Sequence, residues 1–99
     1  MLVPFKDAVQ LDEARIITRV NGEVRQEDAL NRMVFSVRDI MAYVSTFMTL
    51  QAGDVIITGT PTGAGARFDP PRYLSPGDEI EVEVSGLGTL RNWVKDEIL

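Results

Sequence analysis

A segment rich in threonine and glycine has the residue types in this sequence that best suit the binding of an anion. It covers residues 58–65 and reads Thr-Gly-Thr-Pro-Thr-Gly-Ala-Gly. Backbone N–H groups in such a segment can form an anion-binding concavity, and threonine hydroxyls can hydrogen-bond a carboxylate. The segment has neither the Gly-Lys-Ser/Thr of a nucleotide phosphate loop nor the third glycine of a dinucleotide fingerprint. The spacing alone favours a plain connecting loop over a binding site.

A second candidate is a row of alternating glutamates, Glu79, Glu81 and Glu83. Alternate residues of a strand point the same way, about 6.5–7 Å apart, so two such carboxylates can hold a hard cation such as Mg²⁺. The residues between them are apolar and must face the core, which places the glutamates in solvent. Arg91 and Lys95 on or near the opposing strand can then pair with them. The pattern favours a solvated, ion-paired strand face over a metal site.

The composition excludes several other kinds of site. The 99 residues include no Cys and no His, which removes a disulfide framework, a cysteine nucleophile, a Ser-His-Asp triad and the usual zinc ligands. A net charge of −5 argues against nucleic acid or an anionic membrane as a partner. The apolar runs are too short for a signal peptide or a membrane span, so we expect a cytoplasmic protein.

The elements that position these candidates begin with a β-hairpin. Residues 1–14 are expected to be an irregular lead-in, and the β-branched residues at 15–20 predict a strand. Asn21-Gly22 is the preferred pair for a type I′ turn, because both central residues need a positive φ. Residues 23–26 are the expected return strand, and the polar residues 27–33 are expected to form a loop.

An amphipathic helix is predicted next. Ser36 is suited to be its N-cap, with Asp39 as the capping-box partner. A continuous apolar stripe predicts about three to four turns that end before Gly53. The stripe consists of Val37, Ile40, Met41, Val44, Phe47 and Met48. Such a stripe can bind a partner, but packing on the sheet is the favoured interpretation.

The carboxyl-terminal half is predicted to hold a buried strand, a long loop and a second hairpin. Residues 55–57 are apolar at every position, which suits a strand covered on both faces. Residues 58–77 contain four glycines and four prolines and form the loop; loops of this length are usually functional or disordered. Residues 79–84 alternate strictly, the chain turns at 86–88, and residues 89–94 return. Trp93 is expected to fill a core or an interface.

Four stretches of the sequence resemble the carboxyl-terminal part of the fumarylacetoacetate hydrolase family. In chain order they are VNGEVRQ at 20–26, FSV at 35–37, LQAGDVIITGTP at 50–61 and PGDEIEVEVSGLGTLRN at 76–92. The resemblance covers nearly the whole chain. It implies an α+β, mainly β fold, a mixed β-roll of the fumarylacetoacetate hydrolase C-terminal type, present here as a partial roll with one amphipathic helix. It also implies that residues 1–99 are a single partial domain, the latter half of a catalytic domain.

The resemblance also implies a chemistry. Family members hydrolyse, decarboxylate or isomerise acylpyruvates and 2-oxo or 2-hydroxy-dienoic acids with Mg²⁺ or Mn²⁺, often in aromatic catabolism. The metal binds oxo and carboxylate oxygens together and stabilises an enolate. The threonine that matches Thr60 contacts the substrate carboxylate in relatives, and Gly59 keeps the backbone close. By resemblance, Thr58, Gly59 and Thr60 are therefore substrate-binding residues.

The family's metal ligands have no counterpart in this chain. They are a Glu-x-Glu pair and an Asp that precede the matched region, as do the catalytic lysine and a Lys-Gly-x-Asp stretch. Glu81 and Glu83 belong to a later strand and are not that pair. Asn31-Arg32-Met33 departs from the Thr-Ser-Asp/Asn-Met common at that place, which leaves the role of this loop open. We assign no catalytic residue, metal ligand or bound cofactor to this chain and expect it to be inactive alone.

Two functions stay open. In the first, the chain supplies the substrate-contacting Thr-Gly-Thr-Pro loop, and an upstream half or a second chain completes a site with Mg²⁺ or Mn²⁺ around a small oxo-acid substrate. In the second, the chain is a non-catalytic β-rich assembly or binding module that lacks the metal site. A half-roll leaves strand edges and one sheet face uncovered, so we expect a homo-oligomer such as a dimer, or a marginally stable chain.

Overall fold

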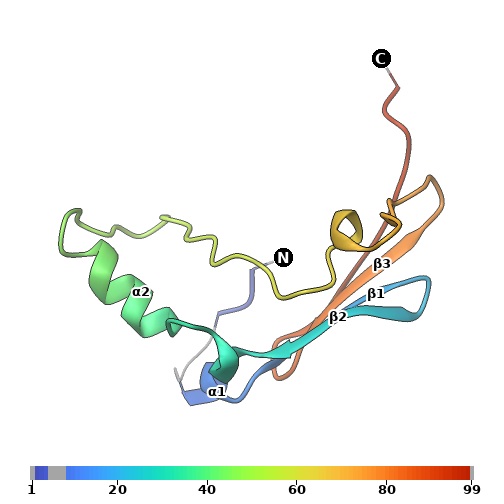
Figure 1. Cartoon of the computed structure of the whole chain (residues 1–99). Coiled ribbons are helices and arrows are strands. Elements are labelled where there is room, and N and C mark those ends of the chain that lie inside the picture. Colours follow the sequence, from blue (N-terminus) through green and yellow to red (C-terminus); the bar gives the residue numbers. More distant parts are fainter. Residues whose placement is uncertain (1, 5–8, 99) are drawn as a thin grey trace.

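Four antiparallel strands form one sheet in the computed structural model, which describes residues 2–4 and 9–98 (Figure 1). Their order across the sheet is β2-β1-β3-β4. The strands are β1 (Arg15–Val20), β2 (Glu23–Ala29), β3 (Glu79–Val84) and β4 (Gly88–Trp93). The helices are α1 (Val9–Asp12) and α2 (Val37–Val44), and two 3-10 turns are η1 (Leu30–Arg32) and η2 (Gly65–Arg67). This architecture confirms the mainly β prediction with one amphipathic helix.

The first hairpin has the predicted turn and a longer return strand. The φ angles are 50° at Asn21 and 79° at Gly22, as a type I′ turn requires. β2 continues to Ala29, so the prediction of a loop from residue 27 was wrong by three residues. Charged side chains suit β2 because it is an edge strand of the sheet. A bulge at Arg25 separates the pairs Thr18↔Gln26 and Arg19↔Val24.

Pairing of β1 with β3 joins the two hairpins into one sheet. The register runs from Ile16↔Val84 to Val20↔Ile80. The side-chain amide of Asn21 reinforces this pairing: its Nδ2 donates to Asp78 Oδ1 (2.8 Å), and its Oδ1 accepts from the Glu79 N–H (2.9 Å). The turn residue of one hairpin is therefore fastened to the start of the other.

The two faces of this sheet differ in chemistry. Thr18 pairs with both Gln26 and Val82, so these side chains share one face. Ile80 and Val84 lie on the same face, as the alternation predicted, and the glutamates of β3 lie on the other. Trp93 pairs with Glu79 and is 63% exposed on that charged face. Trp93 was expected to fill a core or an interface: it does not fill a core, because no described element covers that face, and an interface stays a prediction.

The amino-terminal lead-in is less irregular than predicted. Residue 1 and residues 5–8 lie outside the described residues, but α1 falls within the lead-in. The Ala14 N–H donates to the Leu11 carbonyl (3.1 Å), and the Leu30 N–H donates to the Ala14 carbonyl (2.9 Å). Contact with the distant turn η1 supports this short helix, and such support has no signal in the local sequence.

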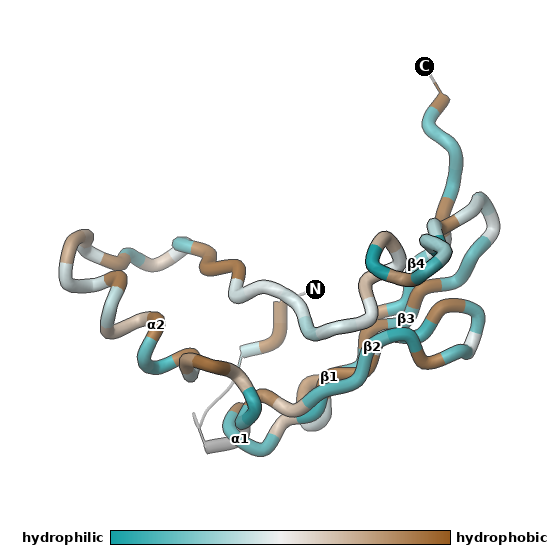
Figure 2. Tube along the Cα trace, in the orientation of Figure 1, coloured by the Kyte–Doolittle hydropathy of each residue, from teal (hydrophilic) through white to brown (hydrophobic). Residues whose placement is uncertain are grey.

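We call residues 33–57 the arm, because this segment projects away from the sheet (Figures 1 and 2). Its helix α2 has the predicted capping box: Ser36 Oγ accepts from the Asp39 N–H (3.1 Å), and Asp39 Oδ2 accepts from the Ser36 N–H (3.0 Å). The prediction that the helix continues through Phe47 and Met48 was wrong. The hydroxyls of Ser45 and Thr46 donate to backbone carbonyls three residues earlier (2.9 and 2.7 Å), which competes with further helix.

The apolar surface of the arm is exposed. α2 contains no buried residue, so the expected packing of this helix on the sheet was wrong. Val55, Ile56 and Ile57 are 82%, 37% and 90% exposed in irregular structure. The predicted buried strand is therefore also wrong for this chain. A strand covered on both faces needs neighbouring elements, and none of the described strands lies beside these residues.

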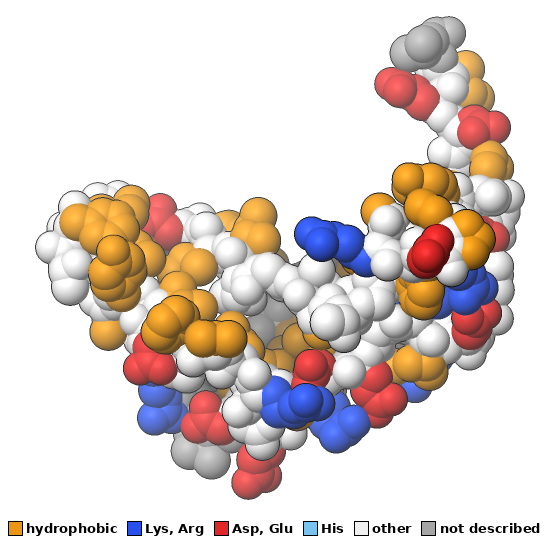
Figure 3. All heavy atoms as spheres, in the orientation of Figure 1, with side chains coloured by type: hydrophobic (Ala, Val, Ile, Leu, Met, Phe, Trp, Pro, Cys, Tyr) orange, Lys and Arg blue, Asp and Glu red, His pale blue; other side chains and the backbone are white. Residues whose placement is uncertain are grey.

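The chain as a whole is open. Its radius of gyration is 15.9 Å, whereas a compact chain of this length has about 13 Å. Its accessible surface is 8065 Å², against about 5,600 Å² for a folded monomer of this mass. Among the described hydrophobic residues only Ala14 and Val20 are buried, and Figure 3 shows apolar side chains gathered over the arm. The chain exposes far more apolar surface than an independent domain does.

Candidate functional site

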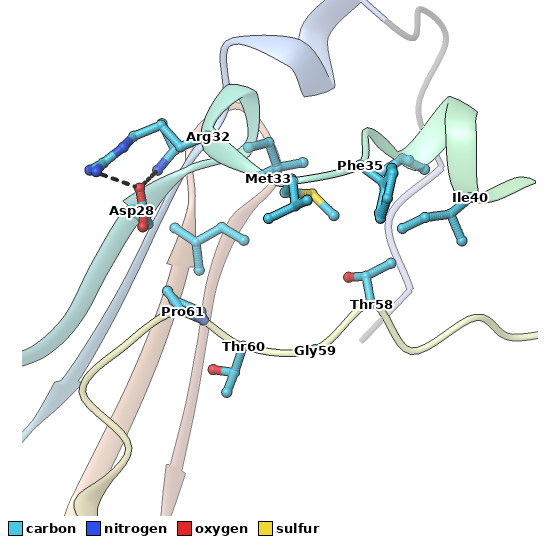
Figure 4. Close-up of a pocket in the computed structure, with 14 residues that line it drawn as sticks. Asp28, Arg32, Met33, Phe35, Ile40, Thr58, Gly59, Thr60 and Pro61 are labelled. Carbon is cyan, nitrogen blue, oxygen red and sulfur yellow. Dashed lines mark hydrogen bonds and ion pairs between the residues drawn. The ribbon is translucent and has the colours of Figure 1, made fainter. Parts of the chain in front are cut away.

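A cavity of about 420 Å³ lies where the arm leaves the sheet (Figure 4). Strands β1 and β2 and the turn η1 line one side of it. The start of the arm lines a second side, with Val34 and Phe35 followed by Val37 and Ile40 of α2. The residues Thr58, Gly59, Thr60 and Pro61 line the third side. The structure therefore places all three predicted substrate-binding residues on one cavity.

The two threonines of this loop point in different directions. Thr58 points toward Met33 and Phe35 across the cavity, and the side chain of Thr60 lies on the other side of the loop (Figure 4). Thr60 Oγ1 accepts a hydrogen bond from Gln26 Nε2 (2.8 Å), and the same nitrogen donates to the Pro61 carbonyl (2.9 Å). The loop is thus fastened to β2 at the position where Thr60 lines the cavity.

Gln26 is a residue that the sequence analysis missed. It was assigned only as the end of the return strand. A polar amide on the apolar face of a strand was the available signal. The bulge at Arg25 decides which face Gln26 occupies, and a bulge leaves no clear mark in a single sequence.

Two glycines allow the loop its path. Gly59 has a φ of 87°, a value that side chains rarely adopt. Gly63 has a φ of 104°, and a Cβ at this position would overlap the carbonyl oxygen of Arg25. The loop therefore approaches β2 more closely than any residue other than glycine permits.

Charged side chains hold the next part of the loop. Two guanidinium groups lie over the Phe68 ring, with the carbons of Arg25 and Arg72 at 5.9 and 5.5 Å from its centre. Arg72 also binds Glu23 through two hydrogen bonds of 2.7 and 3.1 Å. The hydrogen bond from Arg72 holds the pKa of Glu23 below its usual value. These contacts anchor residues 63–72 to the first hairpin.

The charged groups of the cavity already have partners. Asp28 Oδ1 accepts from the Ala29 N–H (2.8 Å) and pairs with Arg32 Nη1 (3.2 Å). The remaining polar groups near the loop are the hydroxyls of Thr58 and Thr60 and the backbone N–H groups beside them. Hydroxyl and amide donors next to an apolar wall suit a small carboxylic acid with an uncharged remainder.

The described residues do not fit a divalent cation. They contain no cluster of three Asp, Glu, His or Cys side chains that could hold a metal. The glutamates of β3 are ion-paired instead: Glu83 with Arg19 (2.7 Å), and Glu81 and Glu79 with Arg91 (3.2 and 3.6 Å). This confirms the interpretation of an ion-paired strand face. Lys95, the other expected partner, is exposed and forms no ion pair within the part of the chain that the structure describes.

A bilayer-spanning helix requires a long and apolar sequence. None of the helices in the described ranges is both long and apolar enough to cross a bilayer.

Comparison with known proteins gives a consistent picture. Residues 1–95 match the model of the fumarylacetoacetate (FAA) hydrolase C-terminal family. The oxaloacetate tautomerase YisK of Bacillus subtilis is 43% identical over 90 residues, which are 90% of this chain and 30% of the tautomerase.

Solved structures show the same fold. A fumarylacetoacetate hydrolase from Exiguobacterium antarcticum is similar with a TM-score of 0.83 and 47% identity, over 88% of this chain and 31% of that one. A fumarylpyruvate hydrolase from Pseudomonas aeruginosa, solved in complex with Mn²⁺ and pyruvate, has a TM-score of 0.74 and 31% identity, over 87% and 34%. The chain spans about a third of the length of each of these proteins.

Proposed function

Because the chain belongs to the fumarylacetoacetate hydrolase family, we propose that it is the carboxyl-terminal part of a catalytic domain that acts on 2-oxo acids or acylpyruvates. The reaction class is C–C hydrolysis, decarboxylation or isomerisation through an enolate. One observation carries the proposal: Thr58, Gly59 and Thr60 all line one cavity beside an apolar wall.

The residues of this chain bind and orient the acid. The Thr60 hydroxyl, which lies on the Gln26 side of the loop, donates to a substrate carboxylate at that edge of the cavity, and Gly59 lets the carboxylate approach the backbone because glycine has no side chain. Phe35 and Ile40 on the opposite wall exclude water from the uncharged part of the substrate. Thr58, which points toward Phe35, contacts that part of the ligand.

The divalent cation, Mg²⁺ or Mn²⁺, is held by polypeptide other than the described residues of this chain. The donor set of the described residues does not fit it. The accessible surface exceeds that of a compact monomer by roughly 2,400 Å², which is more than one partner contributes to a standard interface. Exposure of Val55 and Ile57 supports the arm as the surface that this polypeptide covers.

A hybrid enzyme tests the proposal. Residues 9–98 of this chain replace the matching region of the Bacillus subtilis oxaloacetate tautomerase, and the enol–keto conversion of oxaloacetate is followed by absorbance with Mg²⁺ or Mn²⁺. We expect an active hybrid in which Thr60→Ala raises KM at least several-fold and leaves metal affinity unchanged. Thr89→Ala, at an exposed position of β4 away from the cavity, is the matched control. A Thr60→Ala hybrid with the KM of its parent would remove Thr60 from the site.

The second candidate is a non-catalytic assembly module. The lack of a metal cluster among the described residues and the exposed apolar arm favour it. It predicts that the 99-residue chain forms a stable homo-oligomer whose melting temperature does not respond to Mg²⁺, Mn²⁺ or pyruvate. A partner polypeptide that restores metal binding and oxo-acid turnover would exclude this candidate.

A further inference from the structure

The side-chain amide of Gln26 makes two hydrogen bonds to the loop through one nitrogen. Nε2 donates to Thr60 Oγ1 (2.8 Å) and to the Pro61 carbonyl oxygen (2.9 Å). We propose that Gln26 is a positioning residue that orients the Thr60 hydroxyl as a donor to the substrate carboxylate. This inference rests on the proposed function, because it assigns Gln26 a role toward the acid that Thr60 binds.

The chemistry of the partners fixes the direction of both hydrogen bonds. A carbonyl oxygen only accepts, so the Gln26 atom that faces Pro61 must be the NH₂ group and not the amide oxygen. The two N–H bonds of this group are then directed to Pro61 and to Thr60. Since Thr60 Oγ1 accepts from Gln26, its own proton cannot point to Gln26 and is left to donate elsewhere. Acceptance of one hydrogen bond also strengthens the hydroxyl as a donor.

The backbone around Gln26 holds this amide in place. Gln26 pairs with Thr18 in the ladder, directly after the bulge at Arg25. Gly63 packs against the Arg25 carbonyl, so the far end of the loop is fixed to the same bulge. The Gln26 side chain is half-buried, whereas Thr60 is exposed. Thr60 is therefore held by both strand geometry and hydrogen bonds.

If Gln26 only held the loop in place, it would make the same hydrogen bonds. The test therefore needs a readout that distinguishes this structural role from orientation of the Thr60 hydroxyl toward the substrate. Gln26→Glu keeps the size and shape of the side chain and replaces the donor by an acceptor. The Thr60 proton then turns toward the carboxylate of Glu and away from the substrate. Protonation of that carboxyl at low pH restores one donor. KM of this variant should therefore fall as the pH is lowered through the ordinary range of a glutamic acid, about pH 4–5.

The experiment measures KM and kcat of the hybrid tautomerase as a function of pH. We expect both Gln26→Glu and Gln26→Leu to raise KM roughly three- to tenfold near pH 7, with kcat changed less than twofold, since the neutral hydrogen bond that orients the Thr60 hydroxyl is lost. Only Gln26→Glu recovers on acidification. Asn92→Asp and Asn92→Leu, at an exposed position of β4 that lies neither on the arm nor on the cavity, are controls that keep the parent KM. A parent-like KM in Gln26→Glu, or the same pH response in Gln26→Leu, overturns the inference.

Failure of this inference is distinguishable from failure of the proposed function. If Thr60→Ala raises KM and the Gln26 variants do not, Thr60 binds the acid without Gln26. If neither changes KM, the substrate does not contact this loop. If both sets of variants raise KM, the double variant Gln26→Leu/Thr60→Ala should raise KM by less than the product of the two single increases, because the two residues act through one hydrogen bond.

Nuclear magnetic resonance of the 99-residue chain gives a measurement that needs no turnover. The side-chain NH₂ protons of Gln26 should exchange with water more slowly than those of Gln51 and show cross-relaxation to the Thr60 methyl group. Thr60→Ala should shift one of the two Gln26 protons. Gln26 protons that exchange and resonate like those of Gln51 would contradict the inference even if the hybrid enzyme were inactive.

Discussion

The sheet with its attached loop and the arm are stabilised in opposite ways. Residues 58–72 lie on the first hairpin and are fastened there by Gln26, Gly63 and the Arg72–Glu23 pair. The arm has a far more apolar sequence but no comparable contact with the sheet, and Tyr43 and Phe47 are 71% and 66% exposed. The first region finds its partners within the chain, and the second does not.

This difference indicates what each region is for. A loop that is anchored at several points can place a hydroxyl accurately, as a binding site requires. Exposed apolar residues that follow one another along the arm are typical of an interaction surface, which is the role that we propose for the arm. The candidate cavity lies between the two regions, since residues of both line it.

The largest expected effect on the free energy of unfolding is at Gly63 in the loop, and Gly53 in the arm serves as the comparison. Gly63→Ala should lower the free energy of unfolding by about 3 kcal/mol, because the new Cβ meets the Arg25 carbonyl at a positive φ. Gly53 in the arm has a φ of 99°, but a Cβ there would meet no other atom. Gly53→Ala should therefore lower the free energy of unfolding by only about 1 kcal/mol. Urea unfolding of the chain measures both. Equal costs would mean that the loop is not tightly packed on β2.

Loss of the helix cap should destabilise α2 in the arm without affecting the sheet. Ser36→Ala removes the capping hydroxyl and should destabilise α2 by about 1 kcal/mol. Because α2 makes few contacts with the sheet, we expect faster amide exchange at residues 37–44 and unchanged exchange in β1 and β3. Loss of protection in the sheet as well would show that the two regions fold as one unit.

Acid should lower the stability of both the sheet region and the arm. Hydrogen bonds lower the pKa of three carboxyls in the folded chain: from Arg72 to Glu23, from the Ser75 N–H to Asp78, and from the Ser36 hydroxyl to Asp39. The unfolded chain then binds more protons, so their contribution to stability is full above about pH 4 and is lost as the pH falls through the folded pKa values. Thermal melts from pH 7 to pH 3 should show a falling melting temperature. Glu23→Gln with Asp78→Asn should flatten this dependence, and an unchanged slope would contradict the assignment.

The smallest effect on the isolated chain is expected at the exposed run. Val55→Thr with Ile57→Thr should change the free energy of unfolding by less than about 0.5 kcal/mol, as for other surface substitutions. The same pair should weaken self-association or binding of a completing polypeptide, measured by analytical ultracentrifugation. A strong loss of stability in the monomeric chain would mean that residues 55–57 are buried within it.

Local signals in the sequence predicted the sheet region well. The bounds of β1 and β3, the Asn21-Gly22 turn and the Ser36–Asp39 cap all depend on short-range chemistry, and the structure confirms each of them. The expected strand at 55–57 and the helix packed on the sheet were wrong. Both were inferred from apolar patterns, which show that a segment needs cover but not that the same chain supplies it.

The sequence by itself determined the two hairpins, the capped helix and the family to which the Thr-Gly-Thr-Pro loop belongs. These depend on residue type and on spacings of a few positions. Only the tertiary structure decided that β1 pairs with β3, that a bulge at Arg25 turns Gln26 toward Thr60, and that the arm stays uncovered. Those features depend on contacts between residues far apart in the chain, whose free energies no local pattern records.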